Sequence, residues 1–152
     1  MHQMSQEAIA KIAQIIAEAA KLPLNDAAFA LWRQKSRIDT LEGRPTPEEV
    51  RAYRAMTPKQ QAAKLKHDRD HADEGPIFAH LKQAHAQASD ADIRKAILTA
   101  VRFDTDCFRF FKLHGDFWDC CVRAVAVAAR KHPHFLEQTY KDARNHVAYY
   151  MK

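Results

Sequence analysis

Asp104 is the residue whose position in this sequence most needs a chemical explanation. It belongs to a predicted helix with an apolar stripe formed by Ile93, Ile97, Ala100, Cys107, Phe108 and Phe111. At about 100° per residue, Asp104 falls within roughly 20° of the direction of Ile93 and Phe111. A carboxylate on a buried face is paired with a base, is protonated, or lines a cavity. We therefore expect either a structural ion pair or hydrogen bond at Asp104, or a site for a ligand or metal.

Three histidines on other predicted helices are candidates to join Asp104. His80 and His85 flank the apolar stripe of one helix, and His146 lies at the stripe edge of the last helix, one turn after Asp142. Imidazole and carboxylate ligands suit Zn, Fe or Mn. The sequence thus allows a composite metal or small-ligand site of Asp104, His146 and either His80 or His85. The alternative is that each histidine is a boundary residue with an ordinary hydrogen bond.

A second pair of histidines, His67 and His71, is spaced four residues apart on a predicted helix. This spacing places both imidazoles on one face, within reach of one ion. Asp68 and His71 also form an acid-x-x-His pair, which di-iron bundles use on two helices, but a second copy is missing here. Both histidines lie away from the apolar side of their helix. A charged helix exposed to solvent is therefore the alternative to a metal site.

The usual signatures of catalysis are absent from the sequence. Three glycines in 152 residues cannot build a glycine-rich phosphate loop, and there is no Gly-x-Ser-x-Gly elbow. Cys107, Cys120 and Cys121 have no activating partner nearby in the sequence, so a nucleophilic role is not indicated. These features disfavour a standard hydrolase or kinase, and we expect a protein that is not an enzyme.

The cysteines, the N-terminal residues and the lengths of the apolar runs indicate where in the cell the protein is located. An odd number of cysteines, two of them adjacent, does not make a disulfide framework. All three lie in apolar helical context and are interpreted as small buried residues in a reducing compartment. Residues 1–6 lack the layout of a signal peptide, and no apolar run approaches 18 residues. We therefore expect a cytoplasmic protein that does not contact a membrane.

The C-terminal half offers two candidate interaction surfaces. Aromatic residues are dense between Phe108 and Trp118, and they indicate either a helix packed from two sides or a surface for a partner or second copy. Basic residues from Arg123 onward alternate with His and Tyr, as in surfaces that bind single-stranded nucleic acid. The net charge of +5 is modest, and helical periodicity puts most of these aromatics on the packed side. A nucleic-acid or anionic-surface partner is thus the weaker alternative.

The elements that position these residues are helices. The chain is rich in alanine and poor in glycine, with 47% apolar and 28% charged residues, which favours helices in a globular protein. Thr46 and Thr57 each begin a capping box followed by proline, and Ser5, Ser89 and Asp116 are further N-cap candidates. Asn25 or Asp26 is interpreted as the cap of a second helix. The expected helices cover residues 6–21, 26–43, 47–56, 58–74, 77–88, 90–113, 117–131 and 134–150.

The sequence therefore predicts one all-α domain over residues 1–152, a compact bundle or orthogonal array of about seven helices. The helix 117–129 is apolar around most of its circumference and is expected at the centre. For function we expect a non-enzymatic interaction or regulatory module that self-associates or binds another protein. The first alternative is a metal- or small-ligand-binding bundle, and the second is weak binding of nucleic acid. No motif identifies a family.

Overall fold

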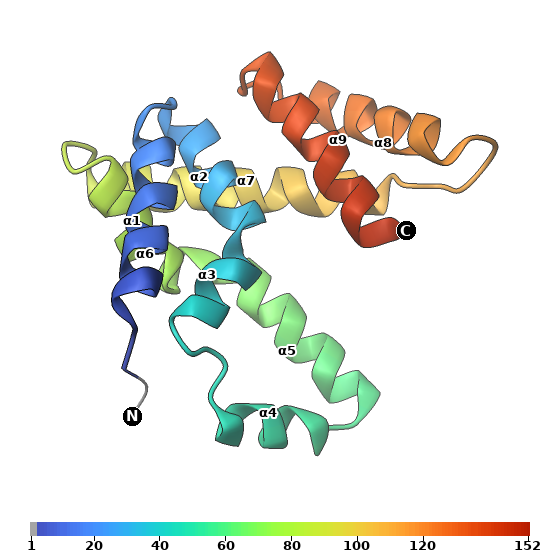
Figure 1. The fold of residues 1–152 in the computed structure, drawn as a ribbon. Coiled ribbons are helices and arrows are strands. Elements are labelled where there is room, and N and C mark those ends of the chain that lie inside the picture. Colours follow the sequence, from blue (N-terminus) through green and yellow to red (C-terminus); the bar gives the residue numbers. More distant parts are fainter. Residues whose placement is uncertain (1–2) are drawn as a thin grey trace.

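The computed structural model describes residues 3–152, and over that range it is all-α, with no strand. Figure 1 shows helices that run in several directions, with α7 crossing behind most of the others. In chain order the elements are α1 (Gln6–Ala20), α2 (Leu24–Arg33), α3 (Lys35–Leu41), α4 (Pro47–Arg54), α5 (Pro58–Asp70), a 3-10 turn η1 (Ala72–Glu74), α6 (Ile77–Ala84), α7 (Asp90–Arg109), α8 (Phe117–Lys131) and α9 (Glu137–Met151).

Five helices begin where the sequence predicts an N-cap. The Ser5, Thr46, Thr57, Ser89 and Asp116 side chains each accept a hydrogen bond from a backbone N–H of the first turn. At Thr46 and Thr57 the third residue of the helix also bonds back to the cap, which completes both capping boxes. The predicted starts of α1, α4, α5, α7 and α8 are confirmed.

Several predicted helix ends are wrong. The helix expected over 26–43 is divided at Gln34, and neither Asn25 nor Asp26 caps it, because the N-cap position is Pro23. The helix expected to reach Leu113 ends at Arg109. The chain then runs without regular structure to α8, and Gly115, at φ 83°, lies in this connection and not directly after the helix. The helices expected to end at Glu74 and Ala88 and to begin at His134 are shorter as well.

The helix at the centre of the packing is α7. It packs against α2, α6, α8, α9 and η1, and its fully enclosed residues include Ile93, Ile97 and Phe103. The expected central position of the helix 117–129 is not confirmed, because α8 packs on α7 and α9 alone among its close neighbours. Trp118 is 43% exposed, and α8 lies toward one edge of the molecule in Figure 1. Helix α8 buries Ala124, Val125 and Ala128 on its inner side, while Val122 and Val127 are half-buried.

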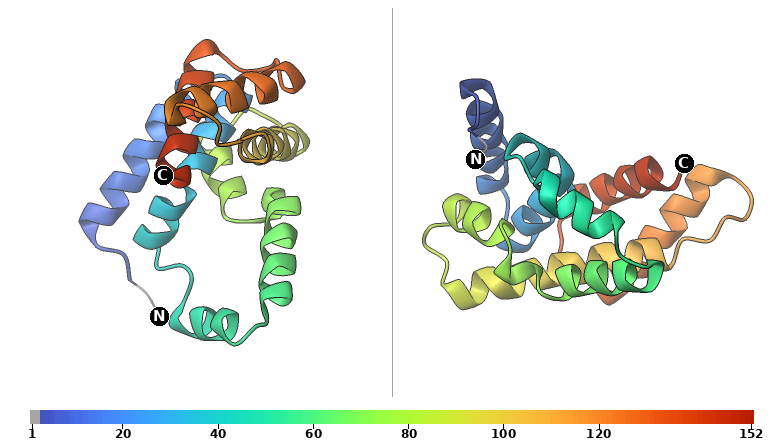
Figure 2. Two further views of the ribbon diagram at one scale, coloured as in Figure 1. Left: turned by 90° about the vertical axis from the view of Figure 1, so that its right-hand side faces the viewer. Right: turned by 90° about the horizontal axis from the view of Figure 1, so that it is seen from below.

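Helices α4 and α5 form an arm, residues 46–71, that stands away from the rest. In Figure 1 and in the left view of Figure 2, α5 leads away from the body and α4 lies across its far end. Neither helix, both of them fully described, contains a buried residue, and neither packs extensively against a helix of the body. The capping boxes therefore stabilise the two helices locally, and the two ends of the arm attach it to the body.

Ion pairs fix one attachment of the arm. Arg44, which precedes α4 in a connection with a cis Arg44–Pro45 peptide, pairs with Glu42 and lies 3.3 Å from Asp39. His80 Nε2 of α6 lies 3.2 Å from the second oxygen of Glu42. These contacts join the connection to α3 and α6. No helix among the described residues is long and apolar enough to cross a membrane.

Candidate functional site

Asp104 is held between two side chains from different helices. Its Oδ2 accepts a hydrogen bond from Trp32 Nε1 of α2 at 3.0 Å, and its Oδ1 lies 3.0 Å from His146 Nε2 of α9. The Asp104 and His146 side chains are each only 13% exposed. The residues that the sequence singled out on α7 and α9 are thus in contact, and Trp32 is a partner that the sequence did not indicate.

The Asp104–His146 contact is close, but its angle is not that of a hydrogen bond. Asp104 Oδ1 is consequently a buried oxygen without a hydrogen-bond partner within residues 3–152. The imidazole itself is enclosed by aromatic rings, with centroids of Phe108 at 5.5 Å, Tyr150 at 5.0 Å and Phe29 at 6.1 Å, all near perpendicular. The ring of His146 is therefore fixed by packing, while one of the two Asp104 oxygens lacks a hydrogen bond.

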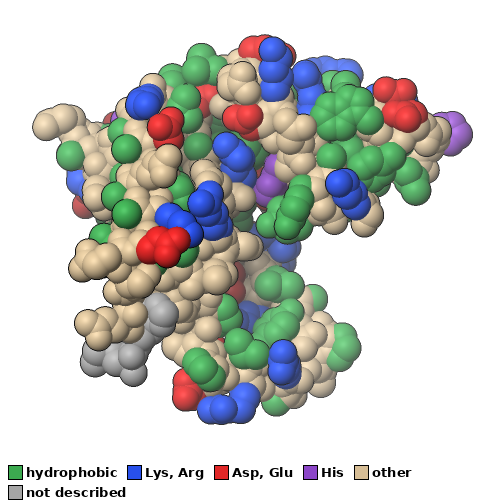
Figure 3. Space-filling view, in the orientation of Figure 1, with side chains coloured by type: hydrophobic (Ala, Val, Ile, Leu, Met, Phe, Trp, Pro, Cys, Tyr) green, Lys and Arg blue, Asp and Glu red, His purple; other side chains and the backbone are tan. Residues whose placement is uncertain are grey.

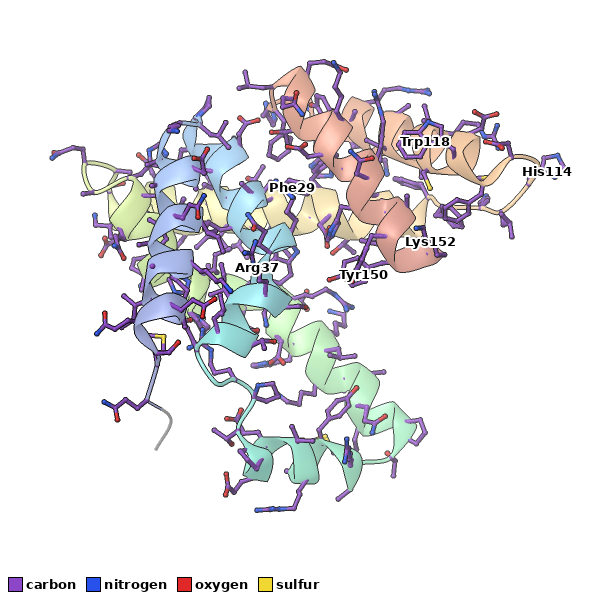
Figure 4. The ribbon with its side chains drawn as sticks, in the orientation of Figure 1. Phe29, Arg37, His114, Trp118, Tyr150 and Lys152 are labelled. Carbon is purple, nitrogen blue, oxygen red and sulfur yellow. The ribbon has the colours of Figure 1, made fainter. Side chains whose placement is uncertain are left out.

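An open cavity of about 620 Å³ adjoins His146. Its lining comes from the end of α2, from α3 and from α9: Arg33, Gln34, Ser36, Arg37, Thr40, Leu41, Asp142, Asn145, His146, Tyr149 and Tyr150. In Figure 4 the labelled Arg37 and Tyr150 lie on the two sides of this space. The volume falls in the usual range for a small-molecule site. We call this space the α3–α9 cavity.

Arg33 is a basic residue of the α3–α9 cavity that the chain satisfies only in part. Its Nη2 lies 3.9 Å from Asp142 Oδ2, beyond hydrogen-bond distance, and its buried Nε has no acceptor in the described chain. Asp142 in turn accepts a hydrogen bond from Gln138 at 3.1 Å. Asp142 and His146, one turn apart on α9, thus each contact other residues.

His80 and His85, the other histidines proposed for a composite site, have different partners. His80 pairs with Glu42 at the root of the arm, and His85 Nε2 lies 2.9 Å from the Leu22 carbonyl oxygen. Both are thus engaged in ordinary hydrogen-bonding contacts between elements. The structure brings His146 to Asp104 and does not bring these two histidines there.

The donor set at Asp104 does not fit a metal site. Zn, Fe and Mn sites in proteins use three or more protein ligands, and Asp104 and His146 supply two. In the part of the chain that the structure describes, no three His, Cys, Asp or Glu side chains are grouped to hold an ion. We derive no metal chemistry from this site.

His67 and His71 lie side by side on the exposed face of α5, as their spacing predicts. Their rings are 4.4 Å apart, and the side chains are 71% and 51% exposed. Their nearest acids, Asp68 and Glu74, are at 3.8 and 3.9 Å. These four residues lie along a groove of about 760 Å³ between the arm and the body.

The lining of this arm groove mixes apolar and charged residues. The apolar part comes from both sides: Leu31, Trp32, Ile38, Pro45, Val50, Tyr53, Leu65, Ala72, Pro76 and Ile77. The charged part has four basic and four acidic residues: Lys35, Arg44, Arg54, Lys64, Asp39, Glu49, Asp68 and Glu74. Leu65 is 47% exposed there, and Figure 3 shows hydrophobic side chains gathered on the arm.

The sequence does not indicate two further acid contacts, made by the buried Asp26 and by the half-buried Asp106. Asp26 is 1% exposed, and its Oδ1 accepts from Leu136 N at 2.8 Å and from Thr139 Oγ1 at 2.5 Å. Asp106 Oδ2 lies 2.8 Å from His132 Nε2 and links α7 to the end of α8. The sequence signal for such a contact is an acid followed by apolar residues. It does not identify the partners of Asp26 and Asp106, which are far away in the sequence.

The cysteines are structural in character. All three are buried, as expected, and burial raises the pKa of the Cys107 thiol far above its ordinary value, with Asp104 and Asp106 adding to the effect. Burial also raises the pKa of Cys121. A thiol held neutral is a poor nucleophile.

Three of the six Lys and Arg residues from Arg123 onward make contacts within the chain itself. Arg123 Nη2 donates to the His114 carbonyl oxygen at 2.8 Å, Lys131 lies over the ring of Phe110, and Arg144 is 3.6 Å from a Glu137 oxygen. On the face drawn in Figure 3, Lys and Arg are scattered and do not form one stripe. Binding of nucleic acid stays a prediction that these contacts do not strengthen.

Comparisons with protein-family models, with curated proteins and with solved structures found no match.

Proposed function

We propose that this protein is a non-enzymatic interaction module that self-associates through the arm groove. The observation that carries the proposal is the α4–α5 arm, which contains no buried residue and leaves an apolar-lined groove of about 760 Å³ against the body. An exposed apolar surface of this kind marks interaction sites on soluble proteins.

Helix energetics support an occupant for the groove. Helices shorter than about 12 to 15 residues are marginal in water, and most of their stability in proteins comes from packing of an apolar face. Helix α5 has 13 residues and α4 has 8. Their capping boxes and the hydrogen bond from Gln61 to the Tyr53 carbonyl oxygen supply local stability only. A second chain in the groove would supply the missing packing.

The charge pattern favours a second copy as that chain. The rim carries four acidic and four basic residues, so it has no net charge that would select a strongly acidic or basic partner. In a two-fold dimer the same surface contacts itself. Lys35, Arg44 and Lys64 already pair with acids of their own chain, which leaves Arg54 and Glu49 as rim charges of opposite sign for a second copy. Leu65, exposed on α5, is the apolar residue that we place at the centre of this contact.

Sedimentation or light scattering over about a hundredfold range of protein concentration tests the proposal. We expect a concentration-dependent dimer in which Leu65→Ser raises the dissociation constant by at least about tenfold, as loss of a central apolar contact does. Ile9→Ser is the matched control, because Ile9 is equally large and 44% exposed, but lies on α1.

Two results contradict self-association through the groove. One is a wild-type protein that stays monomeric at every concentration. The other is a dimer that Ile9→Ser weakens and Leu65→Ser leaves intact. Thermal unfolding of both variants checks that the exposed substitutions leave the fold unchanged.

A further inference from the structure

We infer that the α3–α9 cavity binds a small organic anion, an aromatic carboxylate, independently of any self-association. The cavity joins three features: a pair of arginines on one wall, an imidazole held by Asp104, and exposed phenol rings on the other wall. The arginines match the carboxylate of such a ligand, and the phenol rings match its aromatic ring.

The arginines supply the site for the carboxylate. Arg33 and Arg37 follow each other by about one helical turn across the α2–α3 junction, and both line the cavity. Arg33 has only a long ion pair, with Asp142 at 3.9 Å, and its buried Nε has no acceptor within residues 3–152. A guanidinium with unused donors binds a carboxylate through paired hydrogen bonds.

The opposite wall adds a polar contact and flat apolar surface. Asn145 and His146 project from α9 into the lining, and the phenol rings of Tyr149 and Tyr150 are 73% and 50% exposed. These two rings lie 5.1 Å apart and nearly perpendicular, so each keeps a free face or edge. An aromatic ring of a ligand would pack there at the distances that such rings favour.

Aromatic packing and the close approach of Asp104 set the imidazole orientation at the base of the cavity. His146 Nε2 faces Asp104, so Nδ1 is the ring nitrogen that is turned away from this acid. Trp32 holds the other Asp104 oxygen, so movement of this pair is transmitted to the indole. The site therefore contains its own fluorescent reporter.

The experiment uses the Trp118→Phe variant, in which Trp32 is the remaining tryptophan of the two in the sequence. Benzoate, cyclohexanecarboxylate, acetate and inorganic phosphate are titrated at constant ionic strength while the Trp32 fluorescence is recorded. We expect saturable binding of benzoate, weaker binding of cyclohexanecarboxylate, and the weakest binding of acetate. Isothermal titration of the unsubstituted protein with benzoate provides a readout that does not depend on tryptophan.

Arg37→Gln and Arg130→Gln form a matched pair in this experiment. Both arginines are exposed on helices, and only Arg37 lines the cavity. We expect Arg37→Gln to weaken benzoate binding by about tenfold or more, as loss of a charge-assisted hydrogen bond does, and Arg130→Gln to leave it unchanged.

Three results overturn the inference. The first is the absence of saturable benzoate binding in both measurements. The second is an equal loss in the two arginine variants, which would indicate a nonspecific effect of net charge. The third is phosphate binding as tightly as benzoate, which would remove the role assigned to the aromatic wall.

Discussion

Asp26 belongs to α2 but accepts hydrogen bonds at the start of α9. Helix α9 begins after Leu136, whose side chain cannot accept a hydrogen bond, so its first N–H groups need a partner from elsewhere. Asp26 of α2 supplies it by accepting from the Leu136 backbone N–H, and Thr139 Oγ1 donates to the same oxygen. A carboxylate at a helix N-terminus is also favoured by the helix dipole. This buried contact fixes α9 on α2, and with it the position of His146.

We predict that Asp26→Ala lowers the free energy of unfolding by about 3 kcal/mol, because it leaves buried donors at Leu136 and Thr139 without an acceptor. Asp116→Ala is the comparison, since Asp116 caps α8 at an exposed position and its loss should cost about 1 kcal/mol. Urea unfolding of both variants measures the difference. Equal losses would show that Asp26 acts as an ordinary cap without a special role in holding α9.

Asp104 and Asp26 differ in how clearly the sequence indicates that they are buried. Asp104 interrupts a long apolar stripe, so helical periodicity alone indicates that it is buried. Asp26 stands in the first turn of a helix, where aspartate is common, so the sequence alone indicates a local cap. Its partners are 110 and 113 residues away, a separation that no local pattern encodes. Trp32, similarly, is 72 residues from Asp104.

At the scale of elements, the arm and the central helix differ in what stabilises them. Helix α7 buries seven of its residues, whereas α5 buries none. A helix without buried contacts opens locally at low cost, while a core helix is protected up to global unfolding. The capping box of Thr57 therefore supplies a large share of the stability of α5, whereas the Ser89 cap adds little to the stability of α7.

We predict that Thr57→Ala speeds hydrogen exchange of the α5 amides about fivefold and leaves α7 unchanged, because the loss of a cap costs about 1 kcal/mol and falls on the arm alone. Ser89→Ala, at the cap of α7, is the control and should lower the stability of the whole protein without an added effect in α5. Exchange followed by mass spectrometry measures both. If Thr57→Ala accelerates exchange in α7 as well, the arm and the body unfold together.

Helix starts were more predictable than helix ends or neighbours. A cap is a local hydrogen bond between residues three apart, so Ser5, Thr46 and Thr57 can all be recognised as N-caps from the sequence. The break at Gln34 has no proline or glycine to mark it. It turns the chain so that α2 packs on α7 and α3 packs toward α1, a choice made by tertiary packing. The choice of α7 over α8 as centre has the same origin.

The whole molecule consists of a packed body and a projecting arm with little shared core. The buried apolar cluster draws on α1, α2, α3, α6, α7, α8, α9 and η1, and it takes no residue from α4 or α5. Ala72 and Ile77, which follow the arm, are themselves buried in the body. The arm is thus an insertion between α3 and η1, attached at its root by the Arg44, Glu42 and His80 contacts.

We predict that replacing residues 47–70 by a flexible Gly/Ser linker of about twelve residues leaves the body folded, because the deleted helices bury nothing in the core. The shortened protein should keep the near-ultraviolet circular dichroism of its packed aromatic rings and melt within a few degrees of the full chain. It should also lose the concentration-dependent dimer, since the groove disappears with the arm. A shortened chain that loses its packed aromatic signal would show that the arm belongs to the cooperative core. A folded but still dimeric one would move the interface to the body, where Trp118 and Leu113 are exposed.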